Sequence, residues 1–318
     1  MIVTGVLAAL VILAMLSAIL PAFADDIPVP ADETPIVGMA YDPATEQLWV
    51  AGPRADRGVI VNAEGTTEVE LHATLVSVQA LGWHADRLWL GDIGDPAAER
   101  DHIVVYRLGS TEGGRSTYHA FDYRYQDGPR DAKAMAISGR GNIYVISDGD
   151  NPGIFRIRGE ASRERMNTLV RVHDAPAGVT DAVFLSDGTT LALRSAKGIE
   201  YIDAMKWEPL STETIEGAPA DESIALGPDD QLYVGGNPSV RTHEVVGSSV
   251  STTVSPEASE SPTAEPTPTG SASATETAAP EEQAAQDDAP ARSGTIIALL
   301  LAAVVAVAAG TVTYFWRN

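Results

Sequence analysis

The sequence predicts an all-β fold, a β-propeller, and three observations support this prediction. Short runs of β-branched and aromatic residues alternate with Gly-, Asp- and Pro-rich turns, which is typical of antiparallel strands. One kind of strand recurs, as EQLWVAG at Leu48, DRLWLGD at Leu88, GNIYVIS at Ile143, TTLALRS at Leu191 and DQLYVGG at Leu232. The intervals of 40, 55, 48 and 41 residues match the period of propeller blades, about 40 to 50 residues.

Each repeat is predicted to hold four strands. An apolar first strand precedes the recurring strand, at residues 37–41, 78–83, 134–137, 182–185 and 223–226. A third strand follows in each repeat, and more polar fourth strands are placed at 66–71, 117–125, 166–172 and 211–216. The last repeat has no fourth strand of its own, so residues 27–31 are predicted to supply it and close the ring, which would protect the strand edges. Five four-stranded blades are therefore predicted. A six-bladed ring or an irregular β-sandwich stays open, because the 55-residue interval could hold further strands.

Residues 1–24 are predicted to be a signal peptide. The run from 2 to 20 is almost entirely apolar, and Ala22-Phe23-Ala24 places small residues before a cleavage point at Asp25. The segment ahead of the apolar run has no Lys or Arg, so an uncleaved membrane anchor is the alternative. Both interpretations export the rest of the chain.

The C-terminal part is predicted to be a stalk and a membrane helix. Residues 247–293 consist largely of Ser, Thr, Ala, Pro and Glu and cannot bury enough apolar surface to fold, so a disordered stalk is expected. Residues 294–316 are predicted to form one transmembrane helix, because the uncharged run from Thr295 to Trp316 would span roughly 33 Å against a bilayer core of about 30 Å. Residues 317–318 would then lie in the cytoplasm, with Arg317 following the positive-inside tendency.

Residues 25–246 are left as a single propeller ectodomain, predicted to be a monomer. This segment carries 36 Asp and Glu against 19 Lys and Arg, a net charge of −17, which argues against nucleic acid and anionic lipid as its partners. The chain has no Cys, so an exported domain must be held together by its core.

Acidic residues near the ends of predicted strands are the candidate binding residues. They are Asp92, Asp95, Asp131, Asp181 and Asp221. If these strand ends face one mouth of the propeller, the carboxylates would converge near the axis, where they could bind Ca²⁺ or supply acid and base to a glycosidase-like reaction. The alternative is that each Asp caps a turn by accepting backbone N–H groups. No catalytic residue is assigned, because the chain has no GxSxG elbow, phosphate loop, dinucleotide fingerprint or HExxH.

Three local motifs carry a resemblance to a known family. GDIGD at Gly91 to Asp95, VVYRL at Val104 and DGPRDAKA at Asp127 to Ala134 resemble a family of exported actinobacterial β-propellers, loosely similar to gluconolactonase-like, NHL-like and esterase-like phytase propellers. The family pattern implies Asn after GDIGD and Glu within the second motif, where this chain has Pro96 and Lys133. Both departures remove an oxygen ligand or an acid/base group, so the resemblance implies the fold and weakens the transfer of catalysis or metal binding.

The predicted function is that of a non-enzymatic binding module at the cell surface. The chain would be anchored in the cell membrane by a single helix, with the propeller outside binding an extracellular glycan or protein. The alternative is an extracellular Ca²⁺-dependent hydrolase, a glycosidase or phosphoesterase, with Asp92, Asp95, Asp131 and Asp181 around the axis.

Overall fold

The computed structural model describes residues 26–254, which form an all-β fold as predicted. The predicted signal peptide, most of the predicted stalk and the predicted helix at 294–316 lie outside the described residues. Within residues 26–254, no helix is long and apolar enough to cross a membrane. The helical turns described there are short 3-10 segments, η1 (Ala31–Glu33), η2 (Ala55–Arg57) and η3 (Pro228–Asp230).

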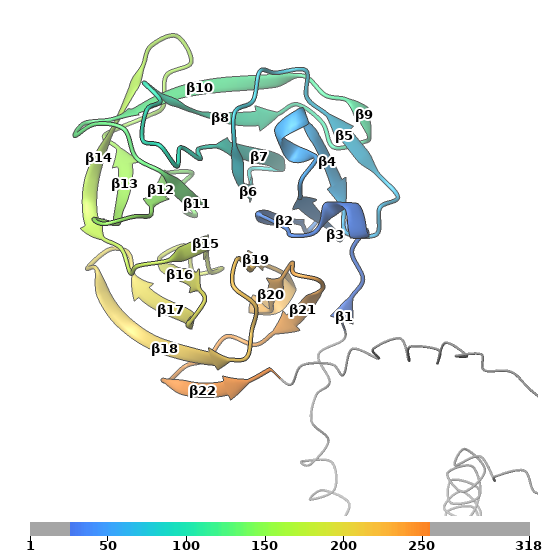
Figure 1. The fold of residues 1–318 in the computed structure, drawn as a ribbon, viewed down its shortest axis with the longest axis vertical. Helices are drawn as coiled ribbons and strands as arrows, with labels where there is room; N and C mark the ends of the chain where they lie inside the picture. Colours follow the sequence, from blue (N-terminus) through green and yellow to red (C-terminus); the bar gives the residue numbers. More distant parts are fainter. Residues whose placement is uncertain (1–25, 255–318) are drawn as a thin grey trace, which may run out of the picture. The chain divides into compact units, whose positions relative to one another are not determined.

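The strands form antiparallel meanders that start near a central axis and run outward (Figure 1). The first two meanders comprise β2 (Gly38–Asp42), β3 (Gln47–Ala51), β4 (Val59–Asn62) and β5 (Glu68–Glu70), then β6 (Val78–His84), β7 (Arg87–Asp92), β8 (Ile103–Leu108) and β10 (Tyr118–Tyr125). The next two comprise β11 (Ala132–Ile137), β12 (Ile143–Ser147), β13 (Gly153–Ile157) and β14 (Asn167–Asp174), then β15 (Val179–Phe184), β16 (Thr190–Ser195), β17 (Gly198–Asp203) and β18 (Glu208–Glu216). The last comprises β19 (Ser223–Leu226), β20 (Leu232–Gly235) and β21 (Val240–His243), completed by β1 (Asp26–Ile27).

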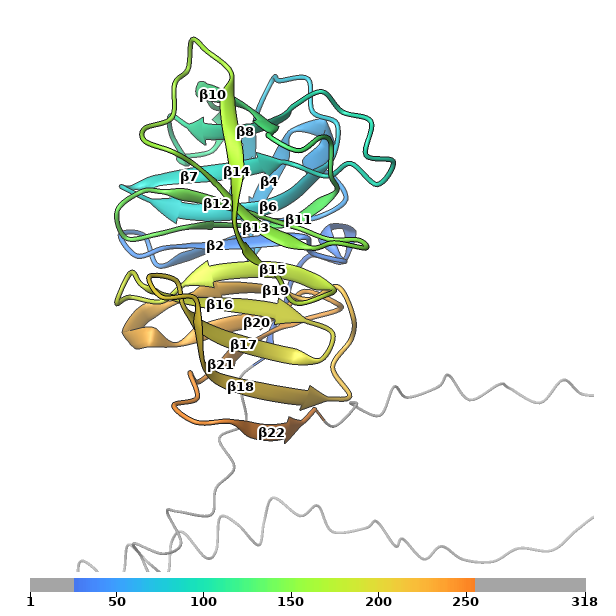
Figure 2. The same cartoon turned by 90° about the vertical axis from the view of Figure 1, so that its left-hand side faces the viewer.

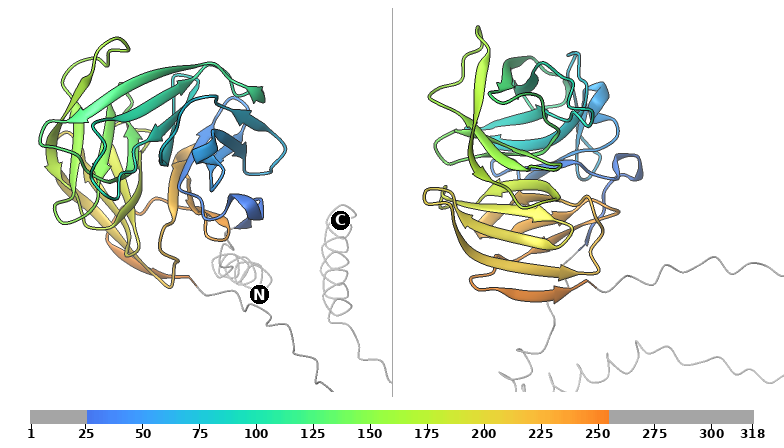
Figure 3. Two further views of the ribbon diagram at one scale, coloured as in Figure 1. Left: turned by 45° about the horizontal axis from the view of Figure 1, so that its top comes forward. Right: turned by 60° about the vertical axis from the view of Figure 1, so that its left-hand side comes forward.

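The innermost strands follow one another around the axis. β2 lies beside β6, β6 beside β11, β11 beside β15, β15 beside β19, and β19 again beside β2. The ring is completed at the start of the described residues, where β1 pairs antiparallel with β21 (Figure 3). The sequence predicts a closing strand at 27–31, and the observed strand overlaps it only at Ile27. This ring of meanders is a β-propeller.

Three parallel pairings join the outer strands of different segments. β10 pairs with β14, which merges two meanders into one eight-stranded sheet. The short strand β9 (Gly114–Arg115) pairs with β5, and β22 (Val250–Thr253) pairs with β18 (Figure 2). Edge strands left open would offer unpaired N–H and C=O groups to other chains, so each pairing covers an exposed edge.

β9 and β22 bear on two predictions from the sequence, that the 55-residue interval could hold further strands and that residues 247–293 are disordered. β9 is the extra strand within the 55-residue interval between repeats, and it covers the edge of β5 instead of starting another meander. β22 lies in the first residues assigned to the stalk, which are therefore paired in a sheet.

Apolar side chains fill the spaces between neighbouring meanders. Trp49 and Leu88 lie in one such cluster, and Val145 and Phe155 in the next, all at zero exposure. The core is thus divided into wedges around the axis, and the residues at the two ends of the axis remain available for a site.

Candidate functional site

Three of the inner strands contain a β-bulge close to their first residue. The pairing of β6 with β7 jumps from Val78 to Ala80, and corresponding jumps occur in β11 and β15. The extra residues are Gln79, Lys133 and Thr180. A bulge bends its strand and redirects the side chain of the extra residue, and bulges are frequent next to binding sites.

The three bulge residues line one cavity at the end of the axis where the inner strands begin. This cavity, here called the polar mouth, has a volume of about 430 Å³. Its wall also includes Pro35, Val37, Asp148, Asp221 and Ser223. Amide, ammonium, hydroxyl and carboxylate groups therefore meet in one space.

Lys133 is the cation of the polar mouth and is held by two neighbours. Its Nζ lies 3.3 Å from an oxygen of Asp131 and donates to the side-chain oxygen of Gln79 at 3.4 Å. The Lys133 side chain is 31% exposed, which leaves donor positions facing the cavity. Thr180 donates its hydroxyl to the backbone oxygen of Glu222 at 2.7 Å, which fixes its rotamer.

Asp92 and Asp95 lie at this end of the molecule, but their carboxylates already have structural partners. Asp92 is 1% exposed, binds both terminal nitrogens of Arg100 at 3.1 Å, and accepts the N–H of Ser77 at 2.7 Å. Asp95 is 5% exposed and accepts the backbone N–H groups of Glu99 and Arg100. Both behave as the turn-capping interpretation describes.

Asp181 is enclosed between two inner strands. It has no exposed surface and accepts the backbone N–H of Ala182 at 2.8 Å and of Ile224, on the neighbouring strand β19, at 3.0 Å. Burial raises the pKa of Asp181 well above its usual value, because no cation compensates the charge. This residue joins two meanders and does not face the cavity.

Asp131 and Asp221 lie closest to the polar mouth among the predicted residues. Asp131 accepts the N–H of Asp95 at 2.7 Å, so its carboxylate connects the second meander to the third beside Lys133. Asp221 is exposed, lines the cavity, and has a left-handed backbone with φ of 62°. The strand ends thus bring the predicted aspartates to one end of the axis, and only these two stand at its surface.

Within residues 26–254, no three His, Asp or Glu side chains lie close enough together to hold a metal ion. Asp92, Asp95 and Asp181 are each committed to the hydrogen bonds above. The expectation of Ca²⁺ stays a prediction.

Gln79, Lys133 and Thr180 were not among the predicted binding residues. Each is a polar residue near the start of an apolar first strand, next to fully buried neighbours such as Ala80 and Ala134. This position could have predicted the site, because polar side chains at equivalent positions of several repeats point in the same direction relative to the axis. Lys133 was instead interpreted only as the loss of an acid.

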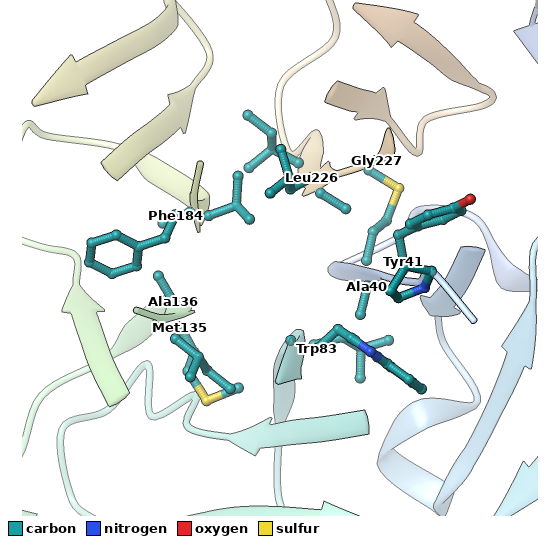
Figure 4. A pocket seen from close by; sticks show the side chains of 17 residues that line it. Ala40, Tyr41, Trp83, Met135, Ala136, Phe184, Leu226 and Gly227 are labelled. Atoms are coloured by element: carbon teal, nitrogen blue, oxygen red, sulfur yellow. The ribbon is translucent and has the colours of Figure 1, made fainter. Parts of the chain in front are cut away.

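The opposite end of the axis is apolar. All of the inner strands contribute to a cavity of about 240 Å³ there, which includes Tyr41, Trp83, Met135, Phe184 and Leu226 (Figure 4). No charged side chain lines it. The two ends of the propeller therefore differ in charge, because the charged side chains that line these two cavities belong to the mouth.

No protein-family model matches the sequence, and no curated protein matches it. Solved structures with a similar course of the chain include a gluconolactonase from Xanthomonas campestris, at 15% identity, 67% coverage of this chain, 86% of that chain and a TM-score of 0.42. A virginiamycin B lyase from Staphylococcus aureus is 14% identical, and the match covers 70% of this chain and 73% of that chain with a TM-score of 0.41. A β-propeller domain from Myceliophteria thermophila has 10% identity, with 68% and 76% coverage and a TM-score of 0.35. At these scores the argument for the fold rests on the strands described above.

Proposed function

We propose that this protein is a five-bladed, membrane-anchored extracellular propeller that binds a sugar unit of a glycan in its polar mouth. The observation that carries the proposal is the set of bulges that directs Gln79, Lys133 and Thr180 into one cavity. A ligand there would meet donors and acceptors held by rigid strands, a favourable arrangement because little side-chain freedom is lost on binding.

A sugar fits the mixture of groups better than a simple ion does. Sugar hydroxyls both donate and accept, and the mouth offers donors from Lys133 together with acceptors from Asp148 and Asp221. The volume of about 430 Å³ lies at the lower end of small-ligand pockets, about 300 to 1,000 Å³, so it has room for one or two sugar units.

The hydrolase alternative requires a pair of carboxyl groups free to act as acid and base or nucleophile. Asp92 is paired with Arg100, Asp95 caps a turn, and Asp131 stands beside Lys133. These partners favour a binding role, and turnover by any of these carboxylates would first require its release.

Replacement of Lys133 tests the proposed binding site. The full-length protein would be screened against glycans, and the dissociation constant of the best ligand measured by calorimetry for Lys133→Ala and Gln79→Ala. Loss of a hydrogen bond from a charged donor costs about 1.5 to 3 kcal/mol, so binding should weaken about ten- to hundred-fold for Lys133→Ala. Lys206→Ala is the matched control, since Lys206 is exposed and lies outside the mouth. Equal affinities for the Lys133 variant and the control would contradict the proposed site.

A thermal-shift measurement distinguishes the alternative. If a carboxylate metal site exists, millimolar Ca²⁺ should raise the melting temperature relative to EDTA, and Asp131→Asn should abolish the rise. A shift of that kind would favour the hydrolase.

A further inference from the structure

A cleft between the third and fourth meanders is lined by two arginines and a tryptophan. It has a volume of about 240 Å³ and lies at the loops that follow the inner strands, away from the polar mouth. The β11–β12 loop contributes Arg140, strand β13 contributes Arg156, strand β12 contributes Tyr144, and the turn after β17 contributes Met205 and Trp207. We call this space the arginine cleft.

Both arginines of the cleft lack an acidic partner. Arg140 and Arg156 form no ion pair within residues 26–254. The guanidinium of Arg156 lies over the ring of Tyr144 at 5.9 Å, which orients it without neutralising it. Arg140 is exposed and Arg156 is partly buried, so both guanidinium groups can be reached by a ligand in the cleft.

The carboxylates on the neighbouring turns are engaged elsewhere. Asp187 accepts the backbone N–H groups of Thr189 and Thr190 at 2.7 Å, within its own turn. Asp203 accepts the N–H groups of Met205 and Lys206 and lies 3.4 Å from the Lys206 ammonium. Neither carboxylate binds Arg140 or Arg156, so an anion would find the two guanidinium groups without displacing a carboxylate.

An aromatic surface stands beside the arginines. Trp207 stacks on His173 with ring centres 5.2 Å apart and an interplanar angle of 12°, and lies 6.2 Å from Tyr144. Its backbone is left-handed, with φ of 62°, a conformation that is rare for a bulky residue and occurs at ligand clamps. The adjacent Met205 is 64% exposed, so the edge of the cleft has a flexible apolar side chain in contact with water.

The geometry points to a second binding site in the arginine cleft, for a small organic anion carried on a flat ring, such as an aromatic carboxylate. The guanidinium groups of Arg140 and Arg156 would hold the carboxylate through charge-assisted hydrogen bonds, and the ring would pack against Trp207 and Met205. A volume of about 240 Å³ is below that of a drug-sized pocket, about 300 Å³ or more, and so favours a single small ring system over a polymer. This site is independent of the proposed glycan site.

The test compares a charged ring with its uncharged counterpart. Binding of 1-naphthoate and of 1-naphthalenemethanol to the full-length protein would be measured by calorimetry at low ionic strength. We expect the carboxylate to bind at least ten-fold more tightly than the alcohol. Arg156→Gln and Arg140→Gln should each weaken naphthoate binding about ten-fold or more, the effect of losing a charge-assisted hydrogen bond.

Arg158→Gln is the matched control, because Arg158 is exposed and lines a different cavity. Melting temperatures of all variants identify any that fail to fold. Trp207→Leu keeps both arginines, so it should weaken the binding of both probes by the same factor. Three results would overturn the site: equal affinity for the two probes, equal losses in Arg158→Gln and Arg156→Gln, or no naphthoate binding at millimolar concentration.

Discussion

At the scale of single residues, one buried carboxylate joins two neighbouring meanders of the propeller. Glu222 is 2% exposed and binds two arginines, Arg194 from strand β16 and Arg241 from strand β21. Burial disfavours ionisation of Glu222, but the hydrogen bonds from Arg241 and Arg194 outweigh it and hold the pKa below its usual value. The ion pair therefore connects the fourth and fifth groups of strands, and its contribution to stability fades as the pH falls below about 4.5.

Removal of this one carboxylate should be costly. Glu222→Gln leaves Arg194, which has no exposed surface, without its counter-charge, and breaking a buried pair in this way costs about 3 to 5 kcal/mol. The free energy of unfolding in urea measures the loss. Glu208→Gln, an exposed glutamate on β18, serves as the control, and a loss no larger than in that variant would show that the network contributes little.

The raised pKa of Asp181 predicts the opposite pH dependence of the free energy of unfolding. Its pKa is raised by burial, so below about pH 4 both the folded and unfolded chains carry the proton and its contribution is intact. Above that pH the unfolded chain releases the proton while the folded one keeps it, and stability declines toward the raised pKa. We expect the free energy of unfolding of Asp181→Asn, relative to that of the wild type, to increase as the pH rises from 4 to 7. Urea titrations at several pH values measure this, and a constant difference between the two proteins would contradict it.

At the scale of the element, β22 shows how a segment with no strong pattern becomes ordered. Thr252 donates its hydroxyl to Glu213 at 2.9 Å, and the other oxygen of Glu213 lies 2.6 Å from Nε2 of His243. A polar Ser- and Thr-rich sequence gives no amphipathic signal, so this strand follows from a partner on β18 and not from its own composition.

Loss of the Thr252 hydroxyl should loosen β22. Thr252→Val keeps the β-branched shape and removes one hydrogen bond to a buried carboxylate, a cost of about 1.5 kcal/mol. Hydrogen exchange of the amides at 250–254 should then accelerate. Thr253→Val, at the exposed neighbouring position, controls for the change of side chain, and similar exchange in both variants would exclude a role for the hydroxyl.

The inner strands show why part of the site escaped prediction. Short apolar runs predicted β6 and β11, although β11 begins at Ala132, two residues before the predicted start at Ala134. A bulge shifts the alternation of side chains along a strand by one residue, so the directions of Gln79 and Lys133 depend on the pairing partner. The burial of Asp92 was equally hidden, because its partner Arg100 lies on an irregular loop eight residues later in the chain.

At the scale of the whole molecule, the ring depends on a contact between the first described strand and the last meander. β1 pairs with β21, and Ile27 packs with the cluster that includes Met39 and Val240. The sequence predicted this closure because the last repeat lacked a strand and the first residues after the predicted signal could supply it. The prediction needed only the count of strands, so it found which end of the chain pairs with β21, but it placed the strand at 27–31 whereas β1 ends at Ile27.

Two truncations test the closure. A chain that begins at Pro28 lacks β1, whereas one that begins at Asp26 keeps it. The shorter chain should melt at a lower temperature and show faster hydrogen exchange at Val240–His243, because the edge of β21 is open. Concentration-dependent association in sedimentation is expected as well. Identical exchange in the two chains would show that β1 does not hold the ring.

The pairing of β22 with β18 also has a mechanical consequence. The chain continues beyond residue 254, and β22 is the last described strand before it does. β22 runs parallel to β18 along four paired residues, so a force applied along the axis of β22 would load the hydrogen bonds between them in shear. The hydrogen bonds between them then share the force and must break together, whereas a strand peeled sideways loses them one by one. A force along β22 would therefore meet the whole set of β18–β22 hydrogen bonds before it reached the meanders.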